Sequence, residues 1–171
     1  IPKKLLKIIP QLLSSTNERF IVCKGWSVTD ELPVSEKLLV IDKADHQWLF
    51  PKCKAAIFHG GAGTLATVMK SKIPAIIISI FADQPIWGKI VERKKVGIHI
   101  PAKSLTTDKL ISAIRLVQTD EIKNNVLIVG EAIRNEKGLD NAVTEIEKYF
   151  GGQKNTAHNI VFMKKGEDGS N

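Results

Sequence analysis

The fold of this chain is decided by residues 55–80, which read AAIFHGGAGTLATVMKSKIPAIIISI. Residues 55–59 (AAIFH) and 74–80 (PAIIISI) are short apolar runs that favour strands, and the second is nearly all apolar, as in a strand buried on both faces. Between them, residues 64–71 place apolar side chains at helical spacing. A strand, a helix and a second strand over this length predict a parallel βαβ unit.

The same alternation continues along the rest of the chain. Apolar runs predict strands over residues 19–24, 37–42 and 96–100, and helical spacing predicts helices over residues 5–13, 84–95, 106–118, 120–135 and 138–150. Strands that alternate with helices predict an α/β fold with a Rossmann-like, doubly wound parallel sheet. We expect one domain over residues 1–150 and a largely disordered tail over residues 151–171, where the composition changes.

Length and composition set limits on the function. A chain of 171 residues can bury its own core without disulfides or a structural metal. No apolar run approaches the roughly 18 residues that a membrane-spanning helix requires. Cys23 and Cys53 lie in or beside apolar runs without a second thiol at metal spacing, so we expect reduced cysteines, no metal and a cytoplasmic protein. Because it begins at Ile1 on a helical pattern, without Met, we expect a piece of something longer.

The formal charge of +7 comes from 25 Lys and Arg against 18 Asp and Glu. The basic residues are scattered among carboxylates, which indicates a solvated surface. Aromatic residues make up 6% of the chain and none alternates with basic residues as a base-stacking platform would require, so we expect no nucleic-acid partner. Phosphate-bearing ligands and peripheral contact with an anionic membrane remain compatible with this charge.

A glycine-rich corner carries the first candidate site. His59 and Gly61, Ala62, Gly63 and Thr64 lie between a predicted strand and a predicted helix. The first N–H groups of a helix have no partner within it, and glycines let a ligand approach the backbone, so this corner predicts a phosphate site. The alternative is a glycine-rich turn with a buried, hydrogen-bonded His59. A dinucleotide site also stays open, because residues 61–66 fit G-x-G-x-x-A and Asp83 follows about 20 residues later.

Asp83 and Gln84 form the second candidate site, just past the predicted strand over residues 74–80. Ligands bind at the carboxyl ends of strands in open α/β sheets, and a carboxylate beside a carboxamide can hold vicinal sugar hydroxyls. The alternative is that Asp83 or Gln84 caps the following helix, and both roles are compatible. A third segment, Asp45 to Phe50, either meets a nucleotide base or docks its aromatic side chains on the core.

Taken in order, residues 46–97, with HQWLFP, HGGAGT and ADQPIWG, resemble the donor-binding stretch of GT-B glycosyltransferases. More narrowly, the stretch resembles the sterol glucosyltransferase-like and antibiotic glycosyltransferase-like branch, and the resemblance extends over about residues 1–150. It implies the C-terminal half of an inverting, metal-independent enzyme that transfers a hexosyl group, such as glucose from UDP-glucose, to a lipid, sterol or small-molecule hydroxyl. No cofactor is implied; the nucleoside-diphosphate sugar is the substrate.

The resemblance also implies residue roles. His59, Gly61, Ala62, Gly63 and Thr64 would bind the donor diphosphate. Asp83 and Gln84 would bind the transferred sugar, and the nucleoside would face Gly25, Trp26, Ser27, Asp45, His46 and Trp48. The general base is expected in an N-terminal acceptor-binding domain, and neither it nor the strand that precedes the first helix in the family has a counterpart here. We therefore expect no catalytic residue in this sequence and negligible transfer by the chain alone.

Two alternatives to this enzyme domain follow from the same residues. The chain could be a non-catalytic, nucleotide-sugar-binding half that requires a partner subunit. It could also be the dinucleotide-binding domain of an oxidoreductase, since motif spacing alone fits both ligands.

Overall fold

The computed structural model describes residues 3–24 and 32–151 of the chain. Its contacts divide the chain into two units, residues 1–135 and 136–171, which are described separately. Three predicted nucleoside-facing residues, Gly25, Trp26 and Ser27, lie outside the described residues, as does the predicted tail from residue 152 onward.

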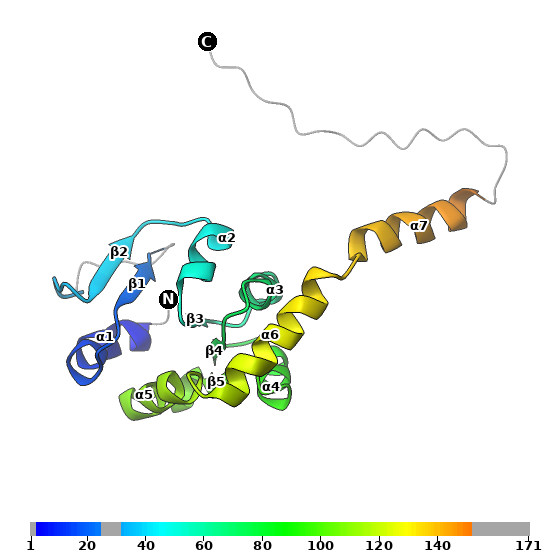
Figure 1. The fold of residues 1–171 in the computed structure, drawn as a ribbon. Helices are drawn as coiled ribbons and strands as arrows, with labels where there is room; N and C mark the ends of the chain where they lie inside the picture. The colour runs from blue at the N-terminus through cyan, green and yellow to red at the C-terminus, as the bar shows by residue number, and fades with distance from the viewer. Residues whose placement is uncertain (1–2, 25–31, 152–171) are drawn as a thin grey trace, which may run out of the picture. The chain divides into compact units, whose positions relative to one another are not determined.

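The described residues of the first unit form five parallel strands in two sheets (Figure 1). One sheet pairs β1 (Phe20–Cys23) with β2 (Leu38–Ile41), and the other has the order β3 (Ala56–Phe58), β4 (Ala75–Ser79), β5 (Gly97–Pro101). All five strands fall within the predicted runs or extend one by a single residue. The apolar β4 is buried along its whole length between two neighbours, as its sequence predicts.

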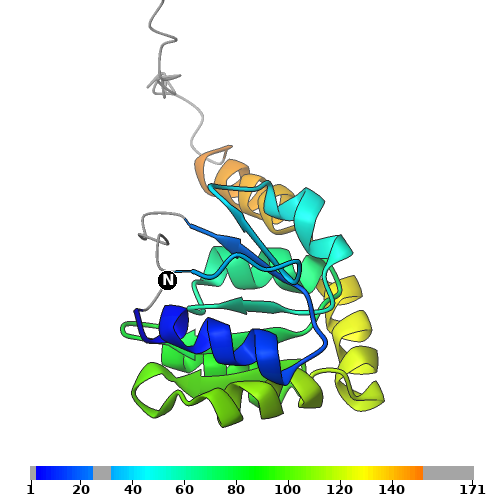
Figure 2. The same cartoon turned by 90° about the vertical axis from the view of Figure 1, so that its left-hand side faces the viewer.

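Two helices cover one face of the β3–β5 sheet. They are α1 (Lys3–Ser15) and α5 (Thr107–Leu116), which lie side by side in front of the sheet in Figure 2. Their apolar side chains pack with Ile76 and Ile78 of β4, and the half-buried Phe20 of β1 joins the same cluster. The hydrophobic layer under the larger sheet therefore extends to β1, although β1 and β3 do not pair with each other among the described residues.

The opposite face is covered by α3 (Ala62–Lys70), α4 (Gln84–Arg93) and α6 (Asp120–Arg134). Helix α6 is bound to the C-terminal end of α3, where Arg134 Nε donates to the carbonyl of Lys70 over 2.8 Å and Lys72 pairs with Glu131. Helices on both faces of parallel strands confirm the predicted α/β class.

Short helices complete the first unit. Helix α2 (His46–Leu49) and the 3₁₀ turn η1 (Phe50–Lys52) precede β3, and η2 (Ala102–Ser104) connects β5 to α5. The second unit contains α7 (Gly138–Gly151). Among the described helices, none combines the length and the apolar character needed to cross a membrane.

Candidate donor-binding site

The two sequence motifs meet at one edge of the β3–β5 sheet. Strands β3 and β4 are parallel, with Phe58 opposite Ile77, so the chain leaves both strands in the same direction. Gly60 then lies against the second loop: a methyl carbon built on it would lie 3.5 Å from both Cβ and the carbonyl oxygen of Gln84. The structure thus brings the glycine corner and the Asp83–Gln84 segment together, as the strand-end argument predicts.

The N-terminus of α3 is open at this corner. The helix begins at Ala62, its N-cap is Gly61, and no side chain among the described residues caps it. The N–H groups of the first turn therefore have no partner within the helix, and they carry the positive end of its dipole. His59 is exposed and its ring lies beside this turn, because a methyl carbon on Gly61 would lie 2.7 Å from the imidazole Nε2.

The glycines of this corner serve different purposes. Gly60 has a φ of +96°, and a methyl carbon there would lie 2.7 Å from Cγ2 of the buried Ile77. The backbone conformation and the packing therefore both require glycine at position 60. Gly63 lies within α3, and nothing is within 4 Å of the place where its Cβ would be. Packing within the described residues therefore does not require a glycine at position 63, and its role in diphosphate binding stays a prediction.

The Asp83 carboxylate is exposed and held in place by a neighbouring side chain. Its Oδ2 accepts a hydrogen bond from Nε1–H of Trp87 over 2.8 Å. Asp83 occupies the N-cap position of α4, but its side chain makes no capping hydrogen bond to the backbone. The half-buried ring of Trp87 packs against the hydrophobic cluster that contains Leu65 and Val68 of α3 and Val91 of α4. The indole hydrogen bond to Asp83 was not predicted, although i, i+4 spacing allows it.

Gln84 is buried, with 6% of its surface exposed, and it organises the loop that precedes it. Its Oε1 accepts hydrogen bonds from the backbone N–H groups of Ile80, over 2.8 Å, and Phe81, over 3.3 Å. The carboxamide oxygen is thus used within the protein. The role of Gln84 in sugar binding stays a prediction, and such a contact would fall to its Nε2.

The segment predicted to face the nucleoside forms the short helix α2. Asp45 caps this helix by accepting a backbone N–H of its first turn over 2.8 Å. The rings of His46 and Phe50 stack with their centroids 4.6 Å apart. Trp48 is 63% exposed and Lys52 Nζ lies 3.8 Å from its ring centroid. The alternative that the aromatic side chains dock on the core holds for the half-buried Phe50 but is wrong for Trp48. The exposed rings of α2 are therefore those of His46 and Trp48.

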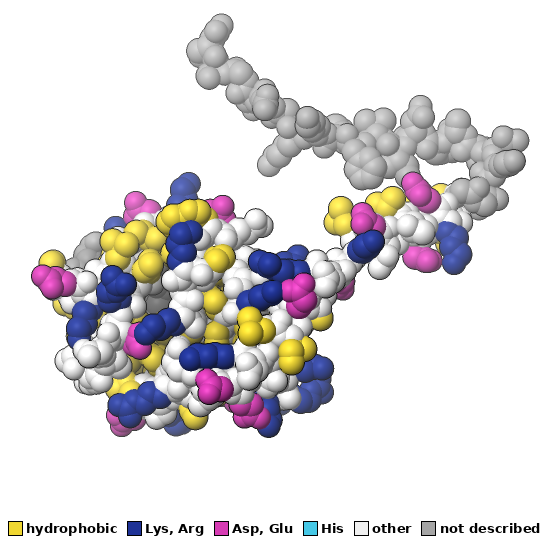
Figure 3. Space-filling model, viewed as in Figure 1, with side chains coloured by type: hydrophobic (Ala, Val, Ile, Leu, Met, Phe, Trp, Pro, Cys, Tyr) yellow, Lys and Arg dark blue, Asp and Glu magenta, His cyan; other side chains and the backbone are white. Residues whose placement is uncertain are grey.

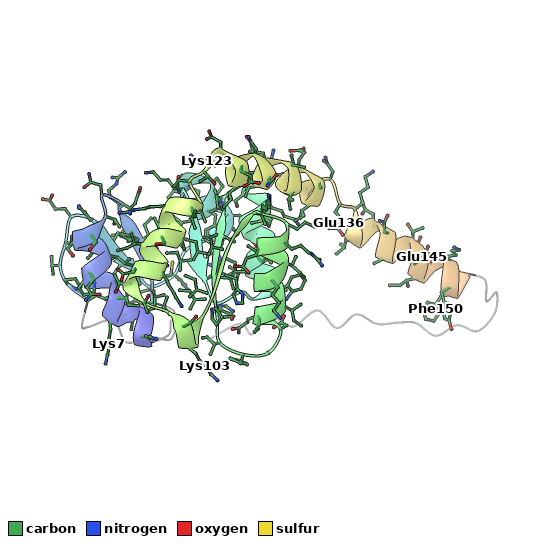
Figure 4. All side chains as sticks on the ribbon, turned by 90° about the horizontal axis from the view of Figure 1, so that it is seen from below. Lys7, Lys103, Lys123, Glu136, Glu145 and Phe150 are labelled. Carbon is green, nitrogen blue, oxygen red and sulfur yellow. The ribbon has the colours of Figure 1, made fainter. Side chains whose placement is uncertain are left out.

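The basic charge is spread over the surface. On the face shown in Figure 3, Lys and Arg side chains are interspersed with acidic and apolar ones. Lys7, Lys103 and Lys123, which belong to three different elements, all point outward in Figure 4. This scatter agrees with a solvated surface rather than one basic patch.

The described residues contain no cluster of three or more His, Cys, Asp or Glu side chains suited to a metal ion. Cys23 and Cys53 are free and half-buried, and burial raises the pKa of both thiols. A hollow of about 340 Å³ lies beside β1 and β2, and none of its lining residues belongs to the glycine corner. Its lining residues are Lys24, Leu32, Pro33, Val34, Ser35, Leu38 and Val40.

A protein-family model described as the C-terminal domain of erythromycin biosynthesis protein CIII-like proteins matches residues 26–149, which include both motifs. The chain belongs to this family. The CIII-like domain is 36% identical over 151 residues to sterol 3-beta-glucosyltransferase UGT80A2 of Arabidopsis thaliana, a match that covers 87% of this chain and 24% of the relative. The sterol 3-beta-glucosyltransferase of Yarrowia lipolytica is 29% identical over 174 residues, with 96% of this chain and 12% of the relative covered.

Solved structures share the fold of the CIII-like domain. The spinosyn forosaminyltransferase SpnP superposes with a TM-score of 0.77 at 17% identity, over 88% of this chain and 40% of SpnP. Glycosyltransferase VinC, solved in complex with dTDP, superposes with a TM-score of 0.73 at 16% identity, over 85% of this chain and 37% of VinC. The predicted fold, a Rossmann-like C-terminal domain of the GT-B type, is confirmed. The domain spans about a quarter of the length of the UGT80A2 relative.

Proposed function

We propose that this domain binds the nucleoside-diphosphate sugar of an inverting glycosyltransferase, with UDP-glucose as the donor. The observation that carries the proposal is the juxtaposition of the open N-terminus of α3, the His59 ring beside it, and the Asp83 carboxylate on the adjoining loop. A diphosphate and a sugar are joined in one donor molecule, and these two kinds of group lie next to each other at the sheet edge.

The diphosphate would lie at the first turn of α3. There the free N–H groups, the helix dipole and the hydroxyl of Thr64 favour an anion, and Gly61 and Gly63 leave the backbone accessible. His59 would add a hydrogen bond to a phosphate oxygen. When an acceptor hydroxyl attacks the anomeric carbon, the bond to the diphosphate breaks and negative charge develops on this leaving group. Donors that are already oriented stabilise that charge without rearrangement.

The sugar would be bound by Asp83. Its carboxylate is exposed at the sheet edge, and the Trp87 indole fixes one oxygen, leaving the other to accept hydrogen bonds from sugar hydroxyls. Glucose as the sugar and a sterol hydroxyl as the acceptor are suggested by the name of the UGT80A2 relative, and a lipid or small-molecule hydroxyl is the wider acceptor class that we propose. The nucleoside would face the exposed His46 and Trp48 rings. Since VinC was solved with dTDP, dTDP-sugars are the competing donor class.

The reaction would require an N-terminal acceptor-binding domain that supplies the general base, because the described site contains groups for the donor alone. We propose a cytoplasmic enzyme, with peripheral membrane contact when the acceptor is a lipid or sterol. We also propose that binding requires no metal, since the α3 N-terminus provides the positive field that a cation would otherwise supply and His59 adds a hydrogen-bond donor beside it.

The proposal is tested by calorimetric titration of the 171-residue chain with UDP, UDP-glucose, dTDP and NAD. We expect UDP-glucose to bind and NAD not to bind. Asp83→Ala should weaken UDP-glucose about tenfold or more, the cost of a charge-assisted hydrogen bond, and should change UDP by less than about twofold. Asp120→Ala is the matched control, because it removes another exposed carboxylate far from the candidate site. Asp120 begins α6 beside the C-terminal end of α4, whereas Asp83 lies at the N-terminal end of α4.

Binding of NAD alone would refute the proposal in favour of a dinucleotide-binding domain. If Asp83→Ala weakened the affinities for UDP and UDP-glucose equally, Asp83 would have no specific role in sugar recognition. Robust sugar transfer by the chain alone would contradict the requirement for an acceptor-binding domain. If the chain binds the donor but the full coding sequence encodes no acceptor-binding domain, the alternative of a non-catalytic half that requires a partner subunit would be favoured.

A further inference from the structure

Ser79 and Gln84 are the two buried polar side chains among the described residues, and they flank the same loop. Ser79 ends β4 with 4% of its surface exposed, and its Oγ lies 2.8 Å from Nε2 of His99 on β5. A buried hydroxyl requires a partner, and His99 provides it. The hydrogen bond joins the last residue of the central strand to the neighbouring strand at the edge that carries the candidate site.

His99 is held by α4 on its other side. A methyl carbon built on Gly88 would lie 2.4 Å from Cγ and Cδ2 of the His99 ring, so the ring lies directly on the helix backbone. The backbone N–H of His99 also faces α4 and donates to Oε1 of Glu92 over 3.3 Å. Glycine at position 88 is therefore required by the imidazole, and this close approach fixes the direction in which the ring points toward Ser79.

The loop between these two buried groups, residues 80–83, depends on polar contacts for its shape. Ile80 and Phe81 are 50% and 67% exposed, so apolar packing holds them weakly. Ala82 has a φ of +57°, a conformation that costs a non-glycine residue free energy and persists where neighbouring contacts enforce it. Ser79 fixes the start of this loop, and Gln84 binds its first two N–H groups.

We propose that His99 is a positioning residue for sugar recognition: through Ser79 it fixes the start of the loop that places Asp83. This inference rests on the proposed function, because Asp83 is taken to bind the sugar. Loss of the His99–Ser79 hydrogen bond should disturb the diphosphate corner less than the Asp83 loop, since His59 and the first turn of α3 follow β3, whereas Ser79 directly precedes the Asp83 loop. The affinity for the sugar should therefore fall while the affinity for the nucleotide stays.

The test measures the ratio of the UDP and UDP-glucose dissociation constants for the 171-residue chain and its variants. His99→Leu should lower the preference for UDP-glucose over UDP about 3- to 10-fold, the range of one lost hydrogen bond. Ser79→Ala removes the other partner of this hydrogen bond and should lower the preference by a similar factor. His99→Gln places an amide where Nε2 lies and should restore most of the preference.

Gly88→Ala provides an independent arm, because the added methyl group must displace the ring without removing any hydrogen-bonding group. It should reduce the preference for UDP-glucose as His99→Leu does. Gly63→Ala is the opposite control, since it should weaken UDP and UDP-glucose together. Melting temperatures measured alongside report stability separately from the ratio.

A lower melting temperature with an unchanged ratio in His99→Leu and Ser79→Ala would overturn the inference and leave His99 a packing residue. If His99→Leu does not fold, Ser79→Ala decides the matter, because it deletes a single oxygen atom. If the parent chain prefers UDP-glucose through Asp83 but His99→Leu, Ser79→Ala and Gly88→Ala all keep that preference, the inference fails and the proposed function stands. If the parent shows no preference and Asp83→Ala has no effect, both fail.

Discussion

Alanine at Gly60 and alanine at Gly63 should have opposite effects, although both glycines belong to the same motif. At Gly60 the φ of +96° is unfavourable for alanine, at a cost of about 1–2 kcal/mol. The methyl group would also lie 2.7 Å from Ile77 Cγ2, well inside the usual 3.5–4.0 Å contact between carbon atoms. Forcing a methyl group into a packed core costs about 1–3 kcal/mol more.

Gly60→Ala should therefore lower the free energy of unfolding by about 2–5 kcal/mol, which corresponds to a drop in melting temperature of roughly 6–15 °C for a chain of this length. At position 63, alanine stabilises the helix relative to glycine by up to about 1 kcal/mol, and no atom lies within 4 Å of the added methyl group. Gly63→Ala should raise the melting temperature slightly. It should weaken UDP binding, because the methyl group stands where a phosphate approaches the first turn.

The assay combines thermal unfolding, followed by circular dichroism, with calorimetric titration of UDP. Equal melting temperatures for the two variants would refute the assignment of a structural role to Gly60. A Gly63→Ala variant that binds UDP as tightly as the parent would refute the argument that the open space at Gly63 serves a ligand.

Two further predictions concern stability away from the site. Gly97→Ala should prevent folding, because its methyl carbon would lie 1.9 Å from the carbonyl oxygen of Ala75 between two paired strands; normal yield of folded protein would contradict this. Lys72 lowers the pKa of Glu131, so this carboxylate stabilises the fold at a pH above its ordinary range and the contribution is lost as the pH falls through its folded pKa. Glu131→Gln should therefore lower the melting temperature more near pH 7 than at acidic pH, and an equal difference at both would show that the ion pair is not responsible.

The sequence predicted the elements of this fold because their signals are local. The apolar run from Ala75 to Ile78 has no amphipathic pattern, so it fits a strand covered on both faces, and β4 is such a strand. The same holds for the glycine corner, where a strand, glycines and a helix follow one another directly. For Trp48 the sequence left both positions open, because an aromatic residue in a short helix has no periodicity that tells the core side from the solvent side; the structure shows it exposed.

The roles within the second motif depended on contacts that cross between elements. From the sequence, Asp83 could have capped α4; in the structure the carboxylate is bound by the Trp87 indole, and the Gln84 carboxamide organises the preceding loop. His99 carried no signal at all, since a histidine in a strand can point either way and its partner Ser79 is 20 residues distant along the chain.

The sequence by itself determined the fold class, the order of the elements and the position of both motifs at strand ends, because these follow from periodicity and from the backbone freedom of glycine. Only the tertiary structure decided which side chains can face a ligand and which are used within the protein. Strand register brought the two loops together, and close packing of α4 on β5 required glycine at position 88 and directed His99 toward Ser79. Such contacts join residues far apart in the sequence, and local sequence patterns do not encode them.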